Sequence, residues 1–298
     1  MQKDKDDIVL PTNDLFIASL WSPPKNEPLL RSLLNCVLTD SGEPPIVQAT
    51  VLNPVNILEY PADKQIRLDV LVKDETDAMY DIEVQTAPHV SFVNRILRYW
   101  SETYNSQLER GDEYKKQHPV RGVVITIFPI FRRLNNLHSV FEICARENPA
   151  VKLTDHFQLH FLRLGDMRNN PAGLDKLNTD LRNWMTFLAY GFEYERDKMN
   201  AMLMESPLVK EAYEEYKKFS ATPELRHLAA ERRRFLVDYE EGMTESREEG
   251  KAEGLAEGEA KGKNERSAEV ARNLRRMGIK LEDISIATGL SISDVEKL

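Results

Sequence analysis

Two short segments of alternating polarity, separated by a turn, constrain the fold of this chain most. Residues 66–73 alternate for part of their length, residues 79–85 alternate throughout, and residues 74–78 have the composition of a turn. A period of two is typical of half-buried strands. The sequence therefore predicts a β-hairpin with one buried and one polar face. The buried face carries Ile66, Leu68, Val70, Tyr80, Ile82 and Val84.

The register of this hairpin brings two acidic side chains together. If the turn takes residues 74–78, Lys73 pairs with Met79, and counting back places Asp69 opposite Glu83. Opposed side chains have Cβ atoms about 4.5 to 5.5 Å apart, so two like charges there cost stability unless they are neutralised. Mg²⁺ or Mn²⁺ takes oxygen ligands and commonly uses one or two carboxylates. The sequence predicts such a metal between Asp69 and Glu83.

A metal at this position suggests phosphodiester hydrolysis. A hard divalent ion polarises the phosphoryl group, lowers the pKa of a bound water and shields the developing charge. Gln85 lies two residues after Glu83 on the same face, where it can orient that water or a substrate oxygen. This chemistry needs no histidine, so we assign no role to His89, His118, His156 or His160.

A competing interpretation treats Asp69, Asp81 and Glu83 as the solvated face of an exposed hairpin, which is usual for acidic residues in strands. The hairpin register by itself favours this interpretation, because a one-residue change in the turn undoes the pairing.

The segments around the hairpin predict a mixed α/β domain. Apolar spacing predicts helices over 14–21, 27–38 and 89–108, the first capped by Asn13 or Thr12, and Gly111 is placed to end the third. Buried strands are predicted over 120–127 and 156–164, after an irregular β-rich stretch over 47–60. Three further helices are expected up to about residue 239, one of them with Trp184, Phe187, Leu188 and Phe192.

Composition changes after Tyr239 and predicts a separate tail. With 298 residues and 41% hydrophobic residues, the chain suits one large domain over 1–240. A Gly/Glu/Lys-rich helical linker is predicted over 241–264 and a small helix-turn-helix-like segment over 265–298. Small residues recur every four positions in the linker, which fits either close approach of a second helix or a frayed, charged helix.

The would-be recognition helix of the last segment carries few cations and has Asp294 and Glu296, which favours a folding or dimerising module over a DNA reader. We therefore expect a homo-oligomer through the C-terminal helices.

Charge and composition exclude several classes of protein. A net charge of −9 excludes a broad electropositive surface, so any contact with DNA must be focused. The charged N-terminus and the absence of any long apolar run predict a cytoplasmic protein without signal peptide or membrane span. Cys36 and Cys144 lie in apolar runs and are predicted to be buried thiols. The candidate DNA contacts are Arg95, Arg98, Arg110, Lys115, Lys116, Arg121, Arg132 and Arg133.

Residues 12–240 resemble the Rpn family of recombination-promoting nucleases, which are also described as PD-(D/E)xK nuclease family transposases. The tail is similar to the tails of that group. The residues that carry the resemblance are Thr12-Asn-Asp-Leu-Phe16, Leu33-Leu-Asn35, Asp69-Val70, Tyr80-Asp-Ile-Glu-Val-Gln85, Arg95-Ile-Leu-Arg-Tyr99, Tyr104, Gln107-Leu108, Gly111 and Tyr114.

This resemblance implies a restriction-endonuclease-like fold, with a mixed central sheet flanked by helices, and a magnesium-dependent DNA endonuclease. It also implies a role in bacterial DNA recombination, transposition or defence. Asp69 matches the first acid of the motif, Glu83 the second, and Gln85 the position that is Lys in the wider superfamily. Asp14 matches the acidic residue of the first helix, an accessory contributor to the metal site.

Two departures from the wider pattern shape the prediction. Gln85 is common in this group, but it leaves a positive charge to be supplied by Arg67 or Arg95. Ile17 and Ala18 follow Phe16 where the group usually has Asp-x-x-Phe-Lys, so a catalytic role for Asp14 is not assigned. With the resemblance added, the nuclease interpretation is preferred. The alternative is a catalytically inert nuclease-like module that binds DNA or protein.

Overall fold

The computed structural model describes residues 8–21, 24–54, 69–192, 202 and 205–298. The chain divides into two compact units, Met1–Arg233 and Arg234–Leu298, which are described separately below. No helix in the described ranges combines the length and apolar composition that crossing a bilayer requires.

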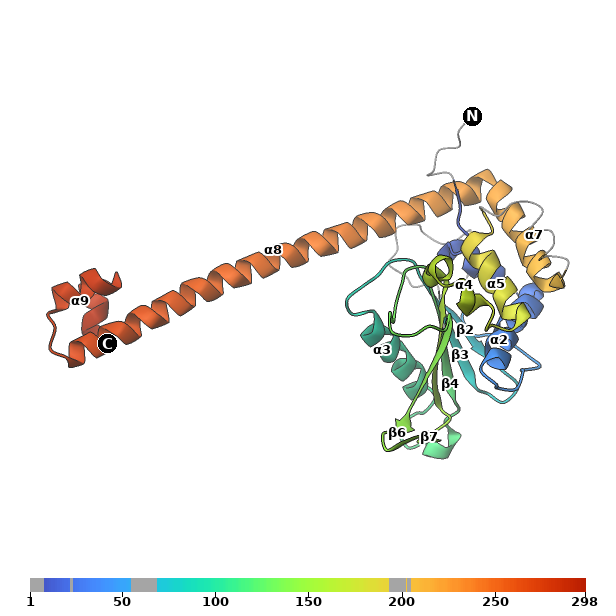
Figure 1. Cartoon of the computed structure of the whole chain (residues 1–298), viewed down its shortest axis with the longest axis horizontal. Coiled ribbons are helices and arrows are strands. Elements are labelled where there is room, and N and C mark those ends of the chain that lie inside the picture. Colours follow the sequence, from blue (N-terminus) through green and yellow to red (C-terminus); the bar gives the residue numbers. More distant parts are fainter. Residues whose placement is uncertain (1–7, 22–23, 55–68, 193–201, 203–204) are drawn as a thin grey trace. The chain divides into compact units, whose positions relative to one another are not determined.

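A six-stranded mixed sheet forms the centre of the first unit (Figure 1). Its strands follow the order β1-β2-β3-β4-β8-β5. β3, β4 and β8 are parallel to one another, whereas β1, β2 and β5 pair antiparallel with their neighbours. Hence the carboxyl ends of β3, β4 and β8 meet at one edge of the sheet. The bounds are β1 Thr50–Val51, β2 Val70–Lys73, β3 Met79–Gln85, β4 Val120–Thr126, β5 His138–Glu142 and β8 Phe157–Arg163.

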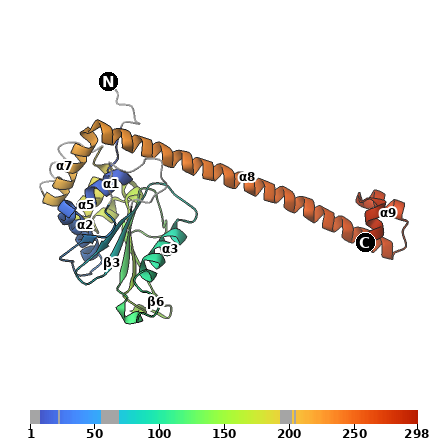
Figure 2. The same ribbon diagram turned by 180° about the vertical axis from the view of Figure 1, so that it is seen from behind.

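Helices cover both faces of this sheet (Figures 1 and 2). α1 Asp14–Trp21, α2 Glu27–Asp40, α5 Thr179–Tyr190 and α7 Pro207–Ala221 pack with the strands in one large apolar cluster. α3 Phe92–Asn105 packs in a second cluster, built on the opposite side chains of β4 and β8. β4 and β8 are therefore buried on both faces, which explains their nearly continuous apolar sequences. The shorter elements are η2 Pro24–Asn26, η4 Tyr114–Lys116, η5 Leu164–Asn169, α4 Pro171–Leu174 and the hairpin β6 Cys144–Ala145 with β7 Asn148–Lys152.

The predicted hairpin and its register are confirmed for the described residues. Lys73 pairs with Met79 and Leu71 with Asp81. The turn is fixed by Asp74, whose buried carboxylate accepts hydrogen bonds from the backbone N–H of Thr76 and Ala78, at 2.7 and 3.1 Å. Tyr80 Oη donates to the other oxygen of the same carboxylate at 2.9 Å. The turn chemistry is local, which is why the sequence predicts the register. Ile66, Arg67 and Leu68 lie outside the described residues.

Several other predicted elements are confirmed, with changed boundaries. α1 begins at Asp14 as expected, and Asn13 Oδ1 accepts from the backbone N–H of Leu15 and Phe16, at 3.1 and 3.2 Å. The helix predicted over 89–108 is shorter, since α3 ends at Asn105 and Gly111, at φ +102°, lies in a later turn. β5 was not predicted. Cys36 is a buried thiol, and Cys144 is a half-buried one.

Three helices make up the C-terminal part of the chain. α8 Pro223–Arg276 runs without interruption through residues 240 and 264, so the predicted domain boundaries there stay predictions. In the second unit the end of α8 packs with α9 Leu281–Thr288 and α10 Ile292–Lys297 around Ala271, Ile284 and Val295. Gly278 and Gly289, at φ +79° and +73°, allow the turns between these helices.

Candidate active site

Glu83 and Gln85 lie at the carboxyl end of β3, on the face that α3 covers. Ile82 and Tyr80 point into the large cluster on the opposite face, so alternation turns Glu83 toward α3. Only 5% of the Glu83 surface is exposed. A carboxylate so deeply buried is costly unless a cation or hydrogen-bond donors compensate it.

Asp69 immediately precedes β2. Continuing the register of the hairpin by one pair places Asp69 opposite Glu83, on the same face. Asn53 holds the backbone there: its Nδ2 donates to the carbonyl of Asp69 at 2.9 Å, and its Oδ1 accepts from the N–H of Leu71 at 2.8 Å. The amide of Asn53 thus extends the ladder beyond β1 and fixes the strand that carries Asp69.

Arg95 on α3 supplies a cation to this site. Its Nη2 lies 3.5 Å from Glu83 Oε1 and donates a short hydrogen bond to Gln85 Oε1. Gln85 Nε2 in turn donates to the carbonyl of Ala87 at 3.0 Å. This fixes the amide orientation, with its oxygen toward the guanidinium. Arg95 on α3 therefore places a positive charge beside Glu83 and Gln85.

Two buried polar atoms beside this group have no hydrogen-bond partner in the described part of the chain. They are Arg95 Nε and Thr126 Oγ1. Thr126 pairs with Gln85 across β3 and β4. A buried unpaired donor or acceptor is costly, so it marks a place where water or a ligand completes the site.

Asp14, another predicted accessory residue, forms different contacts. Asp14 forms an ion pair with Arg232, whose Nε lies 2.9 Å from Asp14 Oδ2, and its Oδ1 accepts from the N–H of Leu15 at 2.9 Å. Arg67 lies outside the described residues.

The oxygen donors fit a hard divalent metal. Among the residues that the structure describes, no three His, Cys, Asp or Glu side chains form a metal-binding group. Mg²⁺ does not require three, since it is commonly bound by one or two carboxylates together with water and substrate phosphate. Asp69 and Glu83 would supply two carboxylates to such an ion, whose charge would compensate that of the buried Glu83.

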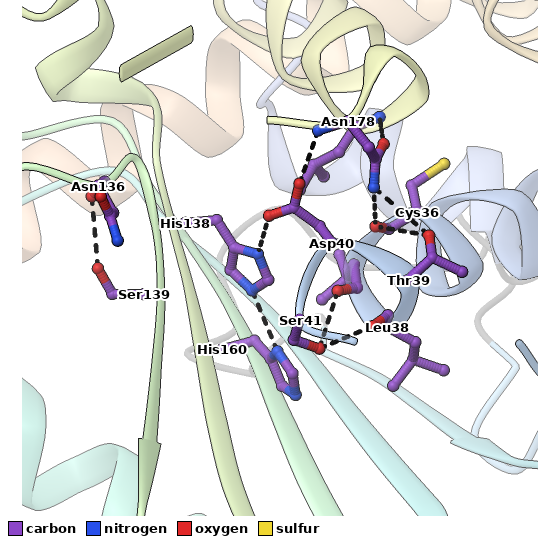
Figure 3. Close-up of polar contacts among 12 residues, drawn as sticks. Cys36, Leu38, Thr39, Asp40, Ser41, Asn136, His138, Ser139, His160 and Asn178 are labelled. Atoms are coloured by element: carbon purple, nitrogen blue, oxygen red, sulfur yellow. Dashed lines mark hydrogen bonds and ion pairs between the residues drawn. The ribbon is translucent and has the colours of Figure 1, made fainter. Parts of the chain in front are cut away.

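A second buried polar cluster lies on the opposite face of the sheet (Figure 3). His138 Nδ1 lies 2.7 Å from Asp40 Oδ2, and His138 Nε2 lies 3.1 Å from His160 Nδ1. Asn178 donates its backbone N–H to Asp40 Oδ1 at 2.7 Å. Burial, helped by the neighbouring His138 and Arg121, lowers the pKa of His160 from 6.5 to about 3. His160 is therefore neutral, and the cluster ties α2 to β5 and β8.

The sequence did not indicate Asn53, Thr126, Asp40 or His138 as members of these groups. Asp40 and His138 are far apart in sequence and carry no motif. An Asn two residues after a short strand, or a Thr at the end of an apolar strand, is common in proteins without any role.

Comparison with protein families gives one finding: the family model described as PD-(D/E)XK nuclease family transposase matches residues 11–246. Comparison with curated proteins and with solved structures gives no significant match.

Proposed function

The chain belongs to the PD-(D/E)XK nuclease family transposases, and from that premise we propose that it is a metal-dependent DNA endonuclease that hydrolyses phosphodiester bonds. Its mixed sheet flanked by helices fits the restriction-endonuclease-like fold of this family. A role in DNA recombination, transposition or defence follows from the same premise and is part of the proposal.

The observation that carries this proposal is the buried Glu83 carboxylate, with Asp69 opposite it in register and Arg95 beside it. Asp69 and Glu83 would hold Mg²⁺, or Mn²⁺ in its place. When bound, such an ion would supply activation of a water molecule and stabilisation of charge on the phosphoryl group. Arg95 contributes a fixed positive charge to the scissile phosphate, and Gln85 orients this guanidinium.

Plasmid cleavage tests the proposal. The purified full-length chain is expected to nick supercoiled DNA when Mg²⁺ or Mn²⁺ is present and to lose this activity in excess EDTA. Gel electrophoresis of plasmid incubated with each metal measures it. Cutting that continues undiminished after chelation would contradict a metal-dependent mechanism.

The alternative is a catalytically inert nuclease-like module. It is favoured by the ion pair of Arg95 with Glu83, which compensates the buried carboxylate without a metal. Calorimetric titration with Mg²⁺ and Mn²⁺ separates the two readings. Heat of binding that saturates below about 10 mM supports the nuclease, whereas no binding in this range supports the inert module.

Replacing Arg95 tests the origin of the missing positive charge. Arg95→Met is expected to lower the cleavage rate by about 100-fold, since one preorganised charge on the phosphate is lost. Arg95→Lys should recover part of this rate, because Lys restores the positive charge but lacks the planar guanidinium that makes the hydrogen bond to Gln85. Arg98→Met is the matched control: Arg98 lies on the same helix, is exposed and pairs with Glu102. Equal rates for Arg95→Met and the unmodified chain would exclude Arg95 as the source.

The C-terminal helices are proposed to form a homo-oligomer. The glycines at 242, 250, 254, 258 and 262 on α8 have open space where a Cβ would lie, and each costs about 1 kcal/mol relative to Ala in a helix interior. A second helix packed on this side offsets that cost. Sedimentation of the chain with and without residues 240–298 checks the proposal, which a monomer at all concentrations contradicts.

A further inference from the structure

The topology of the sheet divides the predicted DNA-binding cations between two edges. Lys115 and Lys116 lie in η4, which precedes the amino end of β4. Arg132 and Arg133 lie in the loop that follows the carboxyl end of β4. Glu83 and Gln85 are at the carboxyl end of β3, parallel to β4. Arg132 and Arg133 therefore belong to the same edge as the candidate active site.

This loop starts in direct contact with the site. Ile127 donates its N–H to the carbonyl of Gln85 at 3.2 Å. Arg132 follows five residues later, so even a fully extended chain places its backbone within about 18 Å of that bond. A DNA duplex carries about one charge per 1.7 Å of its axis. A duplex held at Glu83 would therefore present several phosphates within the reach of about 18 Å that the loop allows.

Arg163 gives the loop a fixed shape. This side chain, 2% exposed, donates from Nη1 to the carbonyls of Ile130 and Phe131, at 2.8 and 3.0 Å, and from Nη2 to the carbonyl of Leu134 at 2.8 Å. Arg163 lies at the end of β8, where it pairs with Thr126. Because the guanidinium is buried, losing these bonds would leave its donors unpaired, so the three bonds hold the carbonyls of the turn in place.

Apolar packing anchors the turn on its inner side. Phe131 has φ +55°, an uncommon value for a residue other than glycine. The centroid of its ring lies 4.8 Å from that of Phe141 and 5.0 Å from that of Phe161. Gly165 allows the backbone of Phe128 to approach, since a Cβ at Gly165 would lie 2.5 Å from the Phe128 carbonyl carbon. Strain at a non-glycine residue persists only where the surroundings hold it.

Arg132 and Arg133 are both exposed in this anchored turn. Within the described ranges neither has an acidic partner, although Arg95, Arg98, Lys115 and Lys116 all do. Two unpaired guanidinium groups on a rigid turn are notable in a chain with a net charge of −9. They provide the focused positive surface that such an acidic protein requires in order to hold a polyanion.

We propose that the Arg132–Arg133 turn binds the phosphate backbone of double-stranded DNA beside the bond that is cut, with Arg163 as the residue that positions the turn. This inference rests on the proposed function, because the partner it assigns is the substrate of that site. The guanidinium groups contact phosphates and carry no base specificity.

DNA binding without cleavage tests the inference. All proteins are full-length and carry Glu83→Gln, and their affinity for a labelled duplex is measured by fluorescence anisotropy over a range of salt concentrations. Loss of two phosphate contacts lowers the slope of log K against log salt by about 1.8, which corresponds to roughly 60-fold weaker binding at 0.1 M salt. The double variant Arg132→Ala, Arg133→Ala is expected to show this lower slope and this weaker binding.

The matched control is Lys115→Ala combined with Lys116→Ala. It removes the same charge from exposed residues at the other edge of the sheet and is expected to leave the slope within about 0.5. Equal slopes for the Arg132 and Arg133 double variant and its parent overturn the inference and leave the proposed function standing. A parent that binds no duplex at any salt concentration contradicts the proposed DNA substrate itself, and with it this assignment.

Discussion

Glu83→Gln is expected to lower the rate of DNA cleavage by about 1,000-fold while the protein stays folded. The substitution keeps the shape of a side chain that is 5% exposed but removes its charge. A metal contributes several kcal/mol to stabilising the transition state, and each 1.36 kcal/mol corresponds to a factor of ten in rate. Plasmid cleavage measures the rate, and calorimetric titration with Mg²⁺ measures loss of the ligand directly.

Asp81→Asn provides the matched control for this experiment. Asp81 lies on the same strand and the same face as Glu83, two residues earlier, and pairs with Leu71 rather than Asp69. Loss of this acid should leave cleavage within about tenfold of the parent rate, whereas Asp69→Asn should resemble Glu83→Gln. If Glu83→Gln cuts as fast as Asp81→Asn, the buried carboxylate has no part in the reaction.

Thermal unfolding measured on the same samples separates a lost metal ligand from a lost fold. The neutral variant relieves repulsion with Asp69 but leaves Arg95 without its carboxylate partner, and these effects oppose each other. We expect the midpoint to move by a few degrees at most, which corresponds to about 1 kcal/mol for a domain of this size.

The protein is expected to lose about 2 kcal/mol of stability between pH 7 and pH 5 through His160 alone. Burial lowers the pKa of this side chain from 6.5 to about 3 in the folded chain, so it binds a proton readily only after unfolding. The unfolded state is therefore stabilised as the pH falls below 6.5. This loss of stability depends little on the pKa of His160 in the folded chain, because His160 remains neutral in the folded protein between pH 7 and pH 5.

Urea unfolding at pH 7 and pH 5 measures this dependence. His160→Gln should be destabilised at pH 7, since the substitution disturbs a fully buried contact with His138, but its stability should fall by about 2 kcal/mol less on acidification. His227→Gln is the control, because His227 is exposed and pairs with Glu231 on the same helix. An unchanged pH dependence in His160→Gln would show that this imidazole is not held neutral by the fold.

The hairpin is the part of the candidate site that the sequence could predict. Its strands alternate in polarity, and its turn is fixed by Asp74 through bonds to residues two to six positions away. Since both signals are local, the sequence determines which residues face each other and predicts the opposition of Asp69 and Glu83. The register predicts that the two acids lie opposite each other, and the family resemblance was needed to prefer Asp69, Glu83 and Gln85 as an active site over a solvated face.

The sequence alone does not determine which cation lies beside Gln85. Arg67 and Arg95 were equally placed in the sequence, one on the hairpin and one on the following helix. Helical spacing of Phe92 and Ile96 predicts that α3 packs on a core, but it does not say which strands lie beneath. Packing of α3 over β4 and β8 is what brings Arg95 to Glu83 and Gln85.

By itself the sequence determined the mixed α/β class, the first two helices and the register of the hairpin, because periodicity, caps and turns act between neighbours in the chain. Only the tertiary structure shows that Arg95 lies beside Glu83, that Arg163 binds the turn of Arg132 and Arg133, and that Asp40 contacts His138, which in turn contacts His160. These contacts join residues up to 98 positions apart. A pattern shows which face of an element is buried, whereas only the assembled layers determine which polar groups meet across it.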